Sequence, residues 1–371
     1  MSKLCVKRIK ELIIHKLSSK LIEYDADKMV DELTDSGKLY KAQRDKLTNV
    51  LLKKPLSQEQ YHGFEKALAY KSAFNKLQKW ADPDFCDMAD KMQGGLIQAL
   101  SSDRPIWDIL LDMICEDNLC HLKGAVIEFI DRKQLWIMFE ELLFDESYYI
   151  NYDNDNPLIL DCGVNIGLAI YYFKHQRPNA RIVGFEPWSV AWECAMRNVE
   201  RNKWTDVTIH RAALSNTDGQ TIMTIISDNS TAATLTNRMD DYLANRSLTP
   251  ITEAIPTVRL APYISEAVDF LKIDIEGMEQ LVLEDCGEAL KNVKWIFVEY
   301  HFSDKIESNK LDQIVSLLAK TGFMLEIGLS VAYSKAVVKR PFLHVGKNVS
   351  MILFGKQIAC QTEKKGSGLN G

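Results

Sequence analysis

The feature that most constrains the fold is an alternation of short apolar runs and amphipathic stretches that begins at residue 157. Five runs have the length and apolar content of buried strands: 157–161, 181–186, 206–210, 268–274 and 294–300. Apolar residues at helical spacing predict helices between or after them, over 166–176, 188–202, 276–290 and 307–320. This alternation predicts an α/β fold with an open, doubly wound parallel sheet and right-handed crossovers.

Two further strand-like runs, 322–328 and 350–354, come late and are separated by irregular sequence. Without a helix between them they cannot both join the sheet as parallel strands, because a parallel connection needs a long crossover. We therefore expect an antiparallel pair at the edge of a Rossmann-like sheet of seven strands.

The first 150 residues lack this alternation and carry helical patterns instead, such as Ile9, Ile13, Leu17 and Leu21 at intervals of four. They predict a helical bundle over 1–80 and a second helical section over 81–150. The sheet domain would then occupy 151–358. The tail, 359–371, is polar and rich in glycine and is expected to be disordered.

Charge and cysteine content indicate the surroundings in which the protein works. Residues 1–80 carry 17 Lys and Arg against 10 Asp and Glu, although the whole chain has a net charge of −6. The basic residues alternate with acids and aliphatics, so we interpret them as a solvated helical face. Eight scattered cysteines and the absence of an apolar signal-like segment favour a cytoplasmic protein without a transmembrane segment. The helical leader is compatible with a homodimer, but the sequence does not fix the oligomeric state.

The turn after the first strand indicates the type of ligand. A dinucleotide fingerprint has the spacing Gly-x-Gly-x-x-Gly, whose second glycine makes room for a pyrophosphate. Here Asn165 stands between Gly163 and Gly167, and an acid, Asp161, precedes the turn. A carboxylate suits a cationic ligand without phosphates, which favours S-adenosylmethionine. An NAD-dependent oxidoreductase is the alternative enzyme.

The next two strands support a nucleoside ligand. Glu186 ends the second strand, nineteen residues after Gly167, where an acid can accept hydrogen bonds from ribose hydroxyls. The third strand runs into Ala212 and Ala213, small residues that leave room for a flat adenine ring.

The fourth and fifth strands end in charged residues. Strand alternation places Lys272, Asp274 and Glu276 on one side of the fourth strand. Glu299 and His301 follow at the end of the fifth strand. Charges in a central strand are costly to bury unless they are paired or functional. We therefore interpret these five residues as the reaction centre.

These motifs in this order resemble the FkbM family of methyltransferases. The resemblance covers roughly 145–355. It is carried by Leu158 to Gly167, Gly184-Phe-Glu-Pro187, Ala213-Leu-Ser215, Phe270 to Gly277 and Glu299-Tyr-His301. It does not reach residues 1–80.

The resemblance implies a class I methyltransferase that uses S-adenosylmethionine and methylates a hydroxyl of a sugar, glycan or natural product. By the family pattern, Asp161, Gly163, Asn165, Gly167 and Glu186 would bind the cofactor, and Lys272, Asp274 and Glu276 would line the reaction centre. We add their neighbours Cys162, Pro187 and Ala213 to the predicted cofactor residues, and Glu299 and His301 at the end of the fifth strand to the predicted catalytic residues.

A hydroxyl is a poor nucleophile, so a base must accept its proton during transfer. Asp274, Glu276, Glu299 and His301 are the candidates, and the sequence does not choose among them. We predict no metal site, although a divalent ion on Asp274 and Glu276 stays open. The nearby Cys115, Cys120 and His121 lack a fourth ligand and read as core residues.

Other classes fit less well. Nucleic-acid amino methyltransferases usually carry an Asn/Asp-Pro-Pro-aromatic run after the fourth strand, and this chain has Asp274-Ile-Glu-Gly277 there. We therefore expect no nucleic-acid partner. A non-catalytic scaffold acting through its helical leader is a further alternative, which the acids at 161, 186, 274 and 276 disfavour. The identity of the acceptor and the role of 1–80 cannot be read from the sequence.

Overall fold

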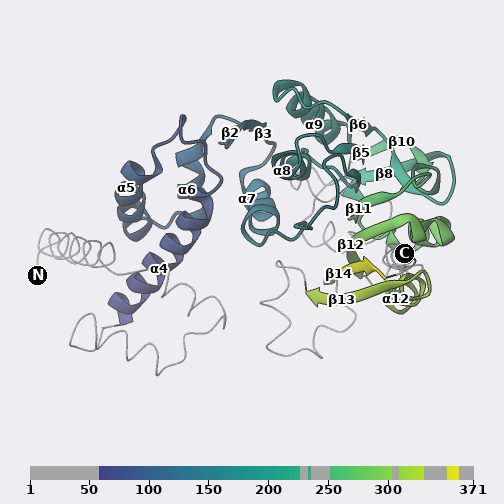
Figure 1. The fold of residues 1–371 in the computed structure, drawn as a ribbon. Helices are drawn as coiled ribbons and strands as arrows, with labels where there is room; N and C mark the ends of the chain where they lie inside the picture. The colour runs from purple at the N-terminus through teal and green to yellow at the C-terminus, as the bar shows by residue number, and fades with distance from the viewer. Residues whose placement is uncertain (1–57, 226–232, 235–250, 303–308, 330–348, 359–371) are drawn as a thin grey trace, which may run out of the picture. The chain divides into compact units, whose positions relative to one another are not determined.

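The computed structural model describes residues 58–225, 233–234, 251–302, 309–329 and 349–358 (Figure 1). The helices expected within 1–57 and the tail at 359–371 lie outside these residues. The chain divides into two compact units, Met1–Lys123 and Gly124–Gly371. This boundary falls inside the section 81–150 that the sequence treats as one piece. Within the described residues, none of the helices has both the length and the apolar character needed to cross a membrane.

The first unit contains three described helices and a short hairpin. The helices are α4 (Gln58–Gln78), α5 (Met88–Ser101) and α6 (Ile106–Ile114). Tyr70, Phe74 and Leu77 recur at helical spacing on α4 and are fully buried. Strands β1 (Cys115–Glu116) and β2 (Leu119–Leu122) pair antiparallel around a two-residue turn.

This hairpin was missed by the prediction of a helical section over 81–150. Asp117 in the turn has φ +53°, a left-handed conformation that Asp and Asn tolerate and that two-residue hairpin turns require. The pair Asp117-Asn118 was therefore a hairpin signal. Of the three candidate metal ligands noted there, Cys120 is fully buried and Cys115 partly so.

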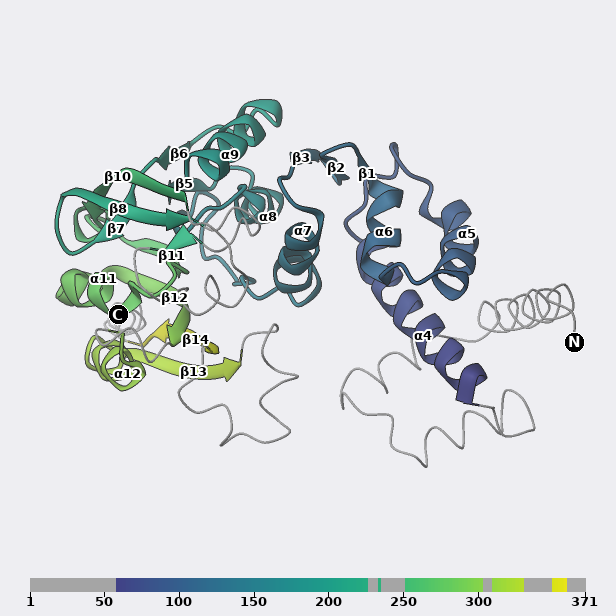
Figure 2. The same ribbon diagram turned by 180° about the vertical axis from the view of Figure 1, so that it is seen from behind.

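The second unit begins with β3 (Ala125–Glu128), α7 (Arg132–Phe139) and a π-helical turn, η1 (Glu140–Phe144). The strands of its main sheet are β4 (Leu158–Cys162), β5 (Arg181–Phe185), β6 (Val207–His210), β11 (Val268–Ile273), β12 (Val293–Phe302), β13 (Phe323–Leu329) and β14 (Val349–Gln357). Its other α-helices are α8 (Leu168–Gln176), α9 (Ser189–Arg201), α11 (Glu279–Cys286) and α12 (Leu311–Lys320). Figure 2 shows the same elements from behind.

The main sheet has the strand order β13-β14-β12-β11-β4-β5-β6. Strands β6, β5, β4, β11 and β12 are parallel, whereas β14 runs antiparallel to both β12 and β13. The predicted Rossmann-like sheet of seven strands is confirmed, and the reversed strand is second from the edge. The chain starts at β4, moves outward to β6 and then returns to β11. Ligands bind at such a switch point, outside the carboxyl ends of the strands.

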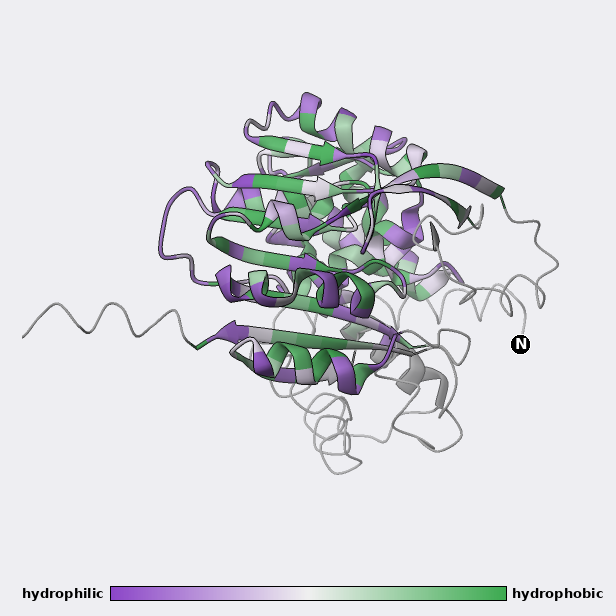
Figure 3. Ribbon diagram, turned by 90° about the vertical axis from the view of Figure 1, so that its right-hand side faces the viewer, coloured by the Kyte–Doolittle hydropathy of each residue, from purple (hydrophilic) through white to green (hydrophobic). Residues whose placement is uncertain are grey.

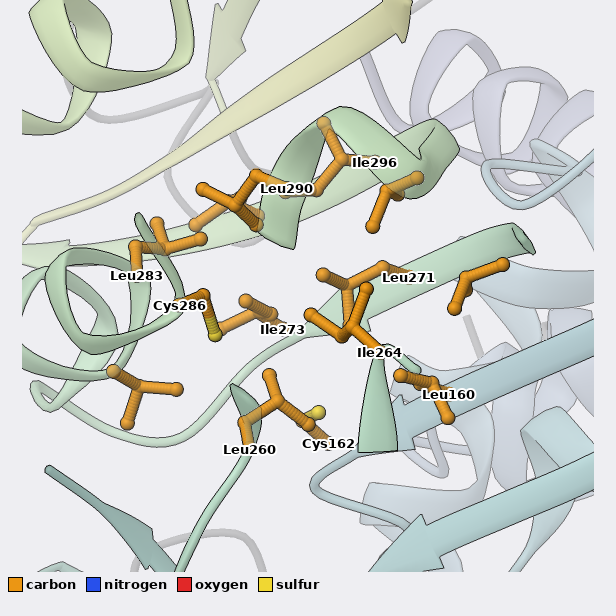
Figure 4. Packing of buried hydrophobic residues seen from close by; sticks show 14 of the residues in the cluster. Leu160, Cys162, Leu260, Ile264, Leu271, Ile273, Leu283, Cys286, Leu290 and Ile296 are labelled. Atoms are coloured by element: carbon orange, nitrogen blue, oxygen red, sulfur yellow. The ribbon is translucent and has the colours of Figure 1, made fainter. Parts of the chain in front are cut away.

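The two faces of the sheet differ in composition. One face packs aliphatic residues of β4, β11 and β12, such as Leu160, Leu271 and Ile296, under α11 and α12 (Figure 4). On the other face, Phe270 of β11 contacts Phe173 of α8, with ring centroids 5.6 Å apart. In Figure 3 the strands are mostly hydrophobic, while the helices alternate hydrophobic and hydrophilic residues.

Each central strand changes from apolar to charged along this second face. Ile159 is followed on the same side by Asp161, Phe270 by Lys272, and Phe297 by Glu299. The apolar positions anchor the sheet, and the charged ones gather at the carboxyl ends of three adjacent strands.

A second sheet, β7-β10-β8-β9, was not predicted. Its strands are β7 (Ala213–Ser215), β8 (Gly219–Ile225), β9 (Ala233–Thr234) and β10 (Ile251–Arg259). Pro256 lies within β10, opposite Gln220 of β8. Proline lacks the N–H that a strand ladder uses, so the segment did not read as a strand.

Candidate functional site

The turn after β4 brings the backbone of the first and fourth strands into close contact. Gly163 has φ +96°, and a Cβ on it would collide with the backbone oxygen of Asp274. The amide of Asp274 donates to the carbonyl of Cys162 at 3.0 Å. Glycine is required at 163 because the chain approaches its neighbour too closely for a side chain.

Asn165 takes a left-handed conformation, with φ +52°, which Asn adopts more readily than most residues. Its side-chain oxygen accepts a hydrogen bond from the amide of Ile166 at 2.7 Å. Its own amide donates to Glu186 Oε2 at 2.8 Å. Asn165 therefore shapes the turn and links it to the end of β5.

Glu186 is 7% exposed and is held by two backbone amides. Oε2 accepts from Asn165, and Oε1 accepts from the amide of Trp188 at 2.9 Å. Burial raises the pKa of this carboxyl to about 7, although the two amide hydrogen bonds oppose the shift. Each oxygen keeps a second lone pair, so the carboxylate can still accept from ligand hydroxyls.

Asp161 is completely buried at the end of β4, next to Lys272 in the β4–β11 register. Lys272 Nζ lies 3.5 Å from Asp161 Oδ1, an ion pair longer than an ordinary hydrogen bond. Within the described part of the chain, neither carboxylate oxygen of Asp161 accepts a hydrogen bond. Burial raises the pKa of Asp161 to about 6, and Lys272 opposes that shift. A buried acceptor of this kind fits a cationic ligand group.

Lys272 connects the turn to the charged ends of β11 and β12. Its Nζ donates to the carbonyl of Gly163 at 2.5 Å and lies 3.4 Å from Asp274 Oδ2. Burial alone would lower the pKa of this ammonium, but the carboxylates of Asp274, Asp161 and Glu141 raise it overall. Lys272 therefore stays charged and holds the two acidic regions together.

Beyond Lys272, one imidazole faces three carboxylates. The side chain of His301 is 4% exposed, and its Nε2 lies 3.8 Å from Asp274 Oδ1, 3.8 Å from Glu276 Oε2 and 3.7 Å from Glu299 Oε1. Burial and the charge of Asp274 raise the pKa of Glu299 to about 8. All four residues that the sequence offered as bases thus surround one point.

The segment after β11 was predicted as helix from 276, but α11 begins at Glu279. Glu276 and Gly277 have φ of +56° and +105°, which a right-handed helix cannot contain. This strained turn directs the carboxylate of Glu276 back toward β12. Left-handed non-glycine residues are costly and cluster at functional sites.

Two positioning residues were missed by the sequence reasoning. Glu279 is completely buried, and its Oε1 lies 2.8 Å from His301 Nδ1. Its other oxygen accepts from Asn309 Nδ2 at 2.5 Å, and Asn309 also donates to the carbonyl of His301 at 2.9 Å. The sequence did contain a hint of Glu279: it is an acid that follows Gly277 by two residues and begins a helix that packs on the sheet. Asn309 left no comparable signal.

A third missed residue, Glu141, comes from η1, upstream of the sheet. Burial, and then the charge of Asp274, raise its pKa to about 7. Tyr148 Oη donates to Glu141 Oε1 at 3.1 Å, and the Tyr148 ring packs edge-on against Phe297 with centroids 4.7 Å apart. π-Helical turns occur often at functional sites. In the sequence, the only hint that Glu141 belongs to the site is that two acids, Glu140 and Glu141, directly precede the apolar residues Leu142 to Phe144.

The remaining four expected cofactor residues lie in four different surroundings. Gly167 has φ +84° and precedes α8 in the turn. The Cys162 side chain packs into the aliphatic core, so that only its backbone faces the turn. Ala213 is buried in a small cluster with Met223, Ile225 and Ile255, against which Trp188 packs. Pro187 is half-buried between Glu186 and Trp188.

Comparison with known proteins gives a consistent result. The methyltransferase FkbM domain profile matches residues 161–325. Methyltransferase 1 of Beauveria bassiana is 29% identical over 159 residues, which are 39% of this chain and 64% of that protein. The 31-O-demethyl-FK506 methyltransferase FkbM of Streptomyces tacrolimicus is 25% identical over 231 residues, 54% of this chain and 86% of that protein.

Among solved structures, methyltransferase FkbM of Methylobacillus flagellatus aligns with a TM-score of 0.38 and 12% identity. The alignment covers 81% of this chain and 62% of that one. The chain therefore spans somewhat less than two thirds of Methyltransferase 1 of Beauveria bassiana and of methyltransferase FkbM of Methylobacillus flagellatus. The matched segment holds the β4 turn, the β11 acids and His301 in one domain. Residues 161–325 belong to the FkbM family of methyltransferases.

Proposed function

We propose that the protein is an S-adenosylmethionine-dependent methyltransferase that methylates a hydroxyl oxygen of a sugar, glycan or other natural product. The observation that carries this proposal is the position of Lys272. Its ammonium lies 3.5 Å from Asp161 and 3.4 Å from Asp274, and so joins the β4 turn to the carboxylate–histidine cluster.

The residues around the β4 turn fit the cofactor. Asp161 offers two buried carboxylate oxygens to an ammonium group, and Glu186 offers its remaining lone pairs to ribose hydroxyls. Bound S-adenosylmethionine supplies a methyl carbon activated by its sulfonium. Gly163 and Asn165 fix the turn that would hold this cofactor beside the ends of β11 and β12.

Transfer to a hydroxyl requires the protein to accept one proton. The acceptor's O–H bond breaks as the new O–C bond forms, and the S–C bond of the sulfonium is the bond that is lost. The cluster of Asp274, Glu276, Glu299 and His301 takes this proton. The name of one relative, 31-O-demethyl-FK506 methyltransferase, specifies an oxygen and supports oxygen as the acceptor atom here.

Calorimetry with S-adenosylhomocysteine and with NADH tests the cofactor assignment. We expect saturable binding of S-adenosylhomocysteine and none of NADH, because Asn165 replaces the glycine that a pyrophosphate needs. Transfer of a labelled methyl group to a panel of hydroxylated sugars and polyketides then tests the acceptor class. Tight NADH binding, or no binding of S-adenosylhomocysteine, contradicts the proposal.

A further inference from the structure

The geometry points to a binding site for a first-row divalent cation formed by Asp274, Glu299 and His301. One ligand atom from each of these residues lies within 4.8 Å of those from the other two. The inference rests on the proposed function for the role of the ion, but ion binding itself depends only on these side chains.

The orientation of His301 is the first argument. Its Nδ1 lies 2.8 Å from Glu279 Oε1, and a carboxylate there accepts the Nδ1–H. This tautomer directs the Nε2 lone pair toward the carboxylates of Asp274 and Glu299, at 3.8 and 3.7 Å. Histidines that bind metals almost always donate their other ring N–H in this way.

Glu279 is itself fixed, which makes the arrangement rigid. Its Oε1 also accepts from the amide of Gly277 at 3.0 Å, and its Oε2 accepts from Asn309. Asn309 holds the His301 backbone as well. The imidazole is therefore oriented before any ligand arrives, as a preformed metal site requires.

The carboxylates are suitably placed to close around an ion. Asp274 Oδ2 faces Lys272, which leaves Oδ1 directed at the imidazole. Ligands at about 2.1 Å from an ion lie roughly 3 Å apart when adjacent. The distances of 3.8 and 3.7 Å from His301 Nε2 therefore need to shrink by less than about 1 Å, and the Asp274–Glu299 separation, which is within 4.8 Å, by less than about 2 Å. The Asp274 and Glu299 side chains are 30% and 16% exposed, so they can make this movement.

One imidazole and two carboxylates select the kind of ion. Mg²⁺ and Ca²⁺ prefer oxygen ligands alone, whereas imidazole suits first-row transition metals. Three protein ligands also leave positions for water or substrate, as in catalytic sites. In the proposed reaction, an acceptor hydroxyl on the ion would lose its proton more readily. Glu276, 3.8 Å from His301 Nε2, is the adjacent carboxylate that takes this proton.

Mn²⁺ is the probe for the test. The full chain, stripped with a chelator, is titrated with Mn²⁺ and followed by electron paramagnetic resonance and calorimetry. We expect one saturable Mn²⁺ per chain. Asp274→Asn, Glu299→Gln and His301→Ala should each weaken binding by at least about tenfold, and Glu279→Gln by about 10- to 100-fold. Glu266→Gln, which alters an exposed carboxylate paired with Arg181, serves as the control and should leave binding unchanged.

Thermal unfolding of each variant shows whether it still folds, and S-adenosylhomocysteine titration separates the two proposals. Variants of the triad should lose Mn²⁺ and keep the nucleoside ligand, whereas Asp161→Ala should do the reverse. The metal site is overturned if the wild type binds Mn²⁺ no more tightly than His301→Ala. In that case His301 and its carboxylates form an ion-pair network. The methyltransferase proposal is then tested by the S-adenosylhomocysteine titration alone.

Discussion

The two acidic regions joined by Lys272 differ in how their charges are supported. Around the β4 turn, Asp161 and Glu186 are almost completely buried, and the Glu186 oxygens are held by backbone amides. At the ends of β11 and β12, Asp274 and Glu276 are partly exposed and both face the imidazole of His301. The first region is rigid and built for one ligand. The second has side chains that can move.

The difference follows from the chemistry that each region serves. An invariant ligand can be matched by fixed backbone donors and buried acceptors. A proton acceptor or a cation site needs groups that change charge or draw together, which some exposure to water permits. Substitution of Lys272 tests the link between the two regions, and substitutions of Asp161 and Glu186 test the first region alone.

The largest effect is expected from Lys272→Met, which leaves Asp161 and Asp274 without their shared cation. Removing one partner of a buried ion pair costs about 3–5 kcal/mol of unfolding free energy. Urea unfolding measures this loss. Lys174→Met is the matched control, because Lys174 is also buried and its hydrogen bonds within the described residues go to the carbonyls of Pro178, Ala180 and Thr205. Lys174→Met should destabilise the fold and leave S-adenosylhomocysteine affinity unchanged; equal loss of affinity in both variants contradicts a special role for Lys272.

A smaller effect is expected from Asp161→Asn, which keeps the shape of the side chain and removes its charge. A charged hydrogen bond contributes about 1.5–3 kcal/mol, so affinity for S-adenosylhomocysteine should fall about 10- to 100-fold. Calorimetry near pH 8, above the pKa of about 6 of Asp161, measures it. 5′-Methylthioadenosine lacks the amino-acid group, and its affinity should not change. Asp274→Asn should leave the affinities for S-adenosylhomocysteine and 5′-methylthioadenosine near wild type. If Asp274→Asn weakens S-adenosylhomocysteine binding and Asp161→Asn does not, the ligand ammonium binds at Asp274, which contradicts the assignment.

The smallest effect is the pH dependence of nucleoside binding through Glu186. Its pKa is raised by burial from 4.5 to about 7, so the carboxylate that accepts ribose hydroxyls forms fully only above that value. Affinity for 5′-methylthioadenosine should fall by about tenfold for each pH unit below 7. Glu186→Gln should abolish this dependence. Wild-type binding that does not vary between about pH 5 and 8 contradicts the assignment.

The raised pKa of Glu186 affects the stability of the free protein in the opposite direction to nucleoside binding. Between pH 4.5 and about 7 the folded state holds the Glu186 proton more tightly than the unfolded state. The contribution of this group to the free energy of unfolding is therefore full below 4.5 and is lost as the pH rises through 7. Binding of the nucleoside and stability of the free protein should thus respond in opposite directions.

Much of this architecture was predictable because the central strands are buried on both faces. Runs such as Leu158 to Leu160 are typical of strands covered on both faces of a parallel sheet. The charged residues at their carboxyl ends were then predictable as neighbours. Asn165 was predicted to hold the turn or to bind a ligand carboxylate, and its left-handed backbone and its hydrogen bond to the amide of Ile166 are those of a residue that holds the turn.

The residues that escaped prediction depend on tertiary contacts. Glu141 reaches the cluster from a π-helical turn, and Asn309 reaches Glu279 from a position thirty residues along the chain. No periodicity encodes such meetings. The second sheet was hidden by Pro256, which argues locally against a strand that its neighbours nevertheless hold.

Strand β14 also bears on how the protein is made. Glu299 and His301 lie on β12, which pairs with β11 on one side and with β14 on the other. Synthesis proceeds from the N-terminus at about 5–20 residues per second, so Val349–Gln357 emerges several seconds after β12. During that interval β12 is an exposed sheet edge, open to pairing with other chains. The strand that carries the histidine is thus one that a nascent chain must protect until β14 has been made.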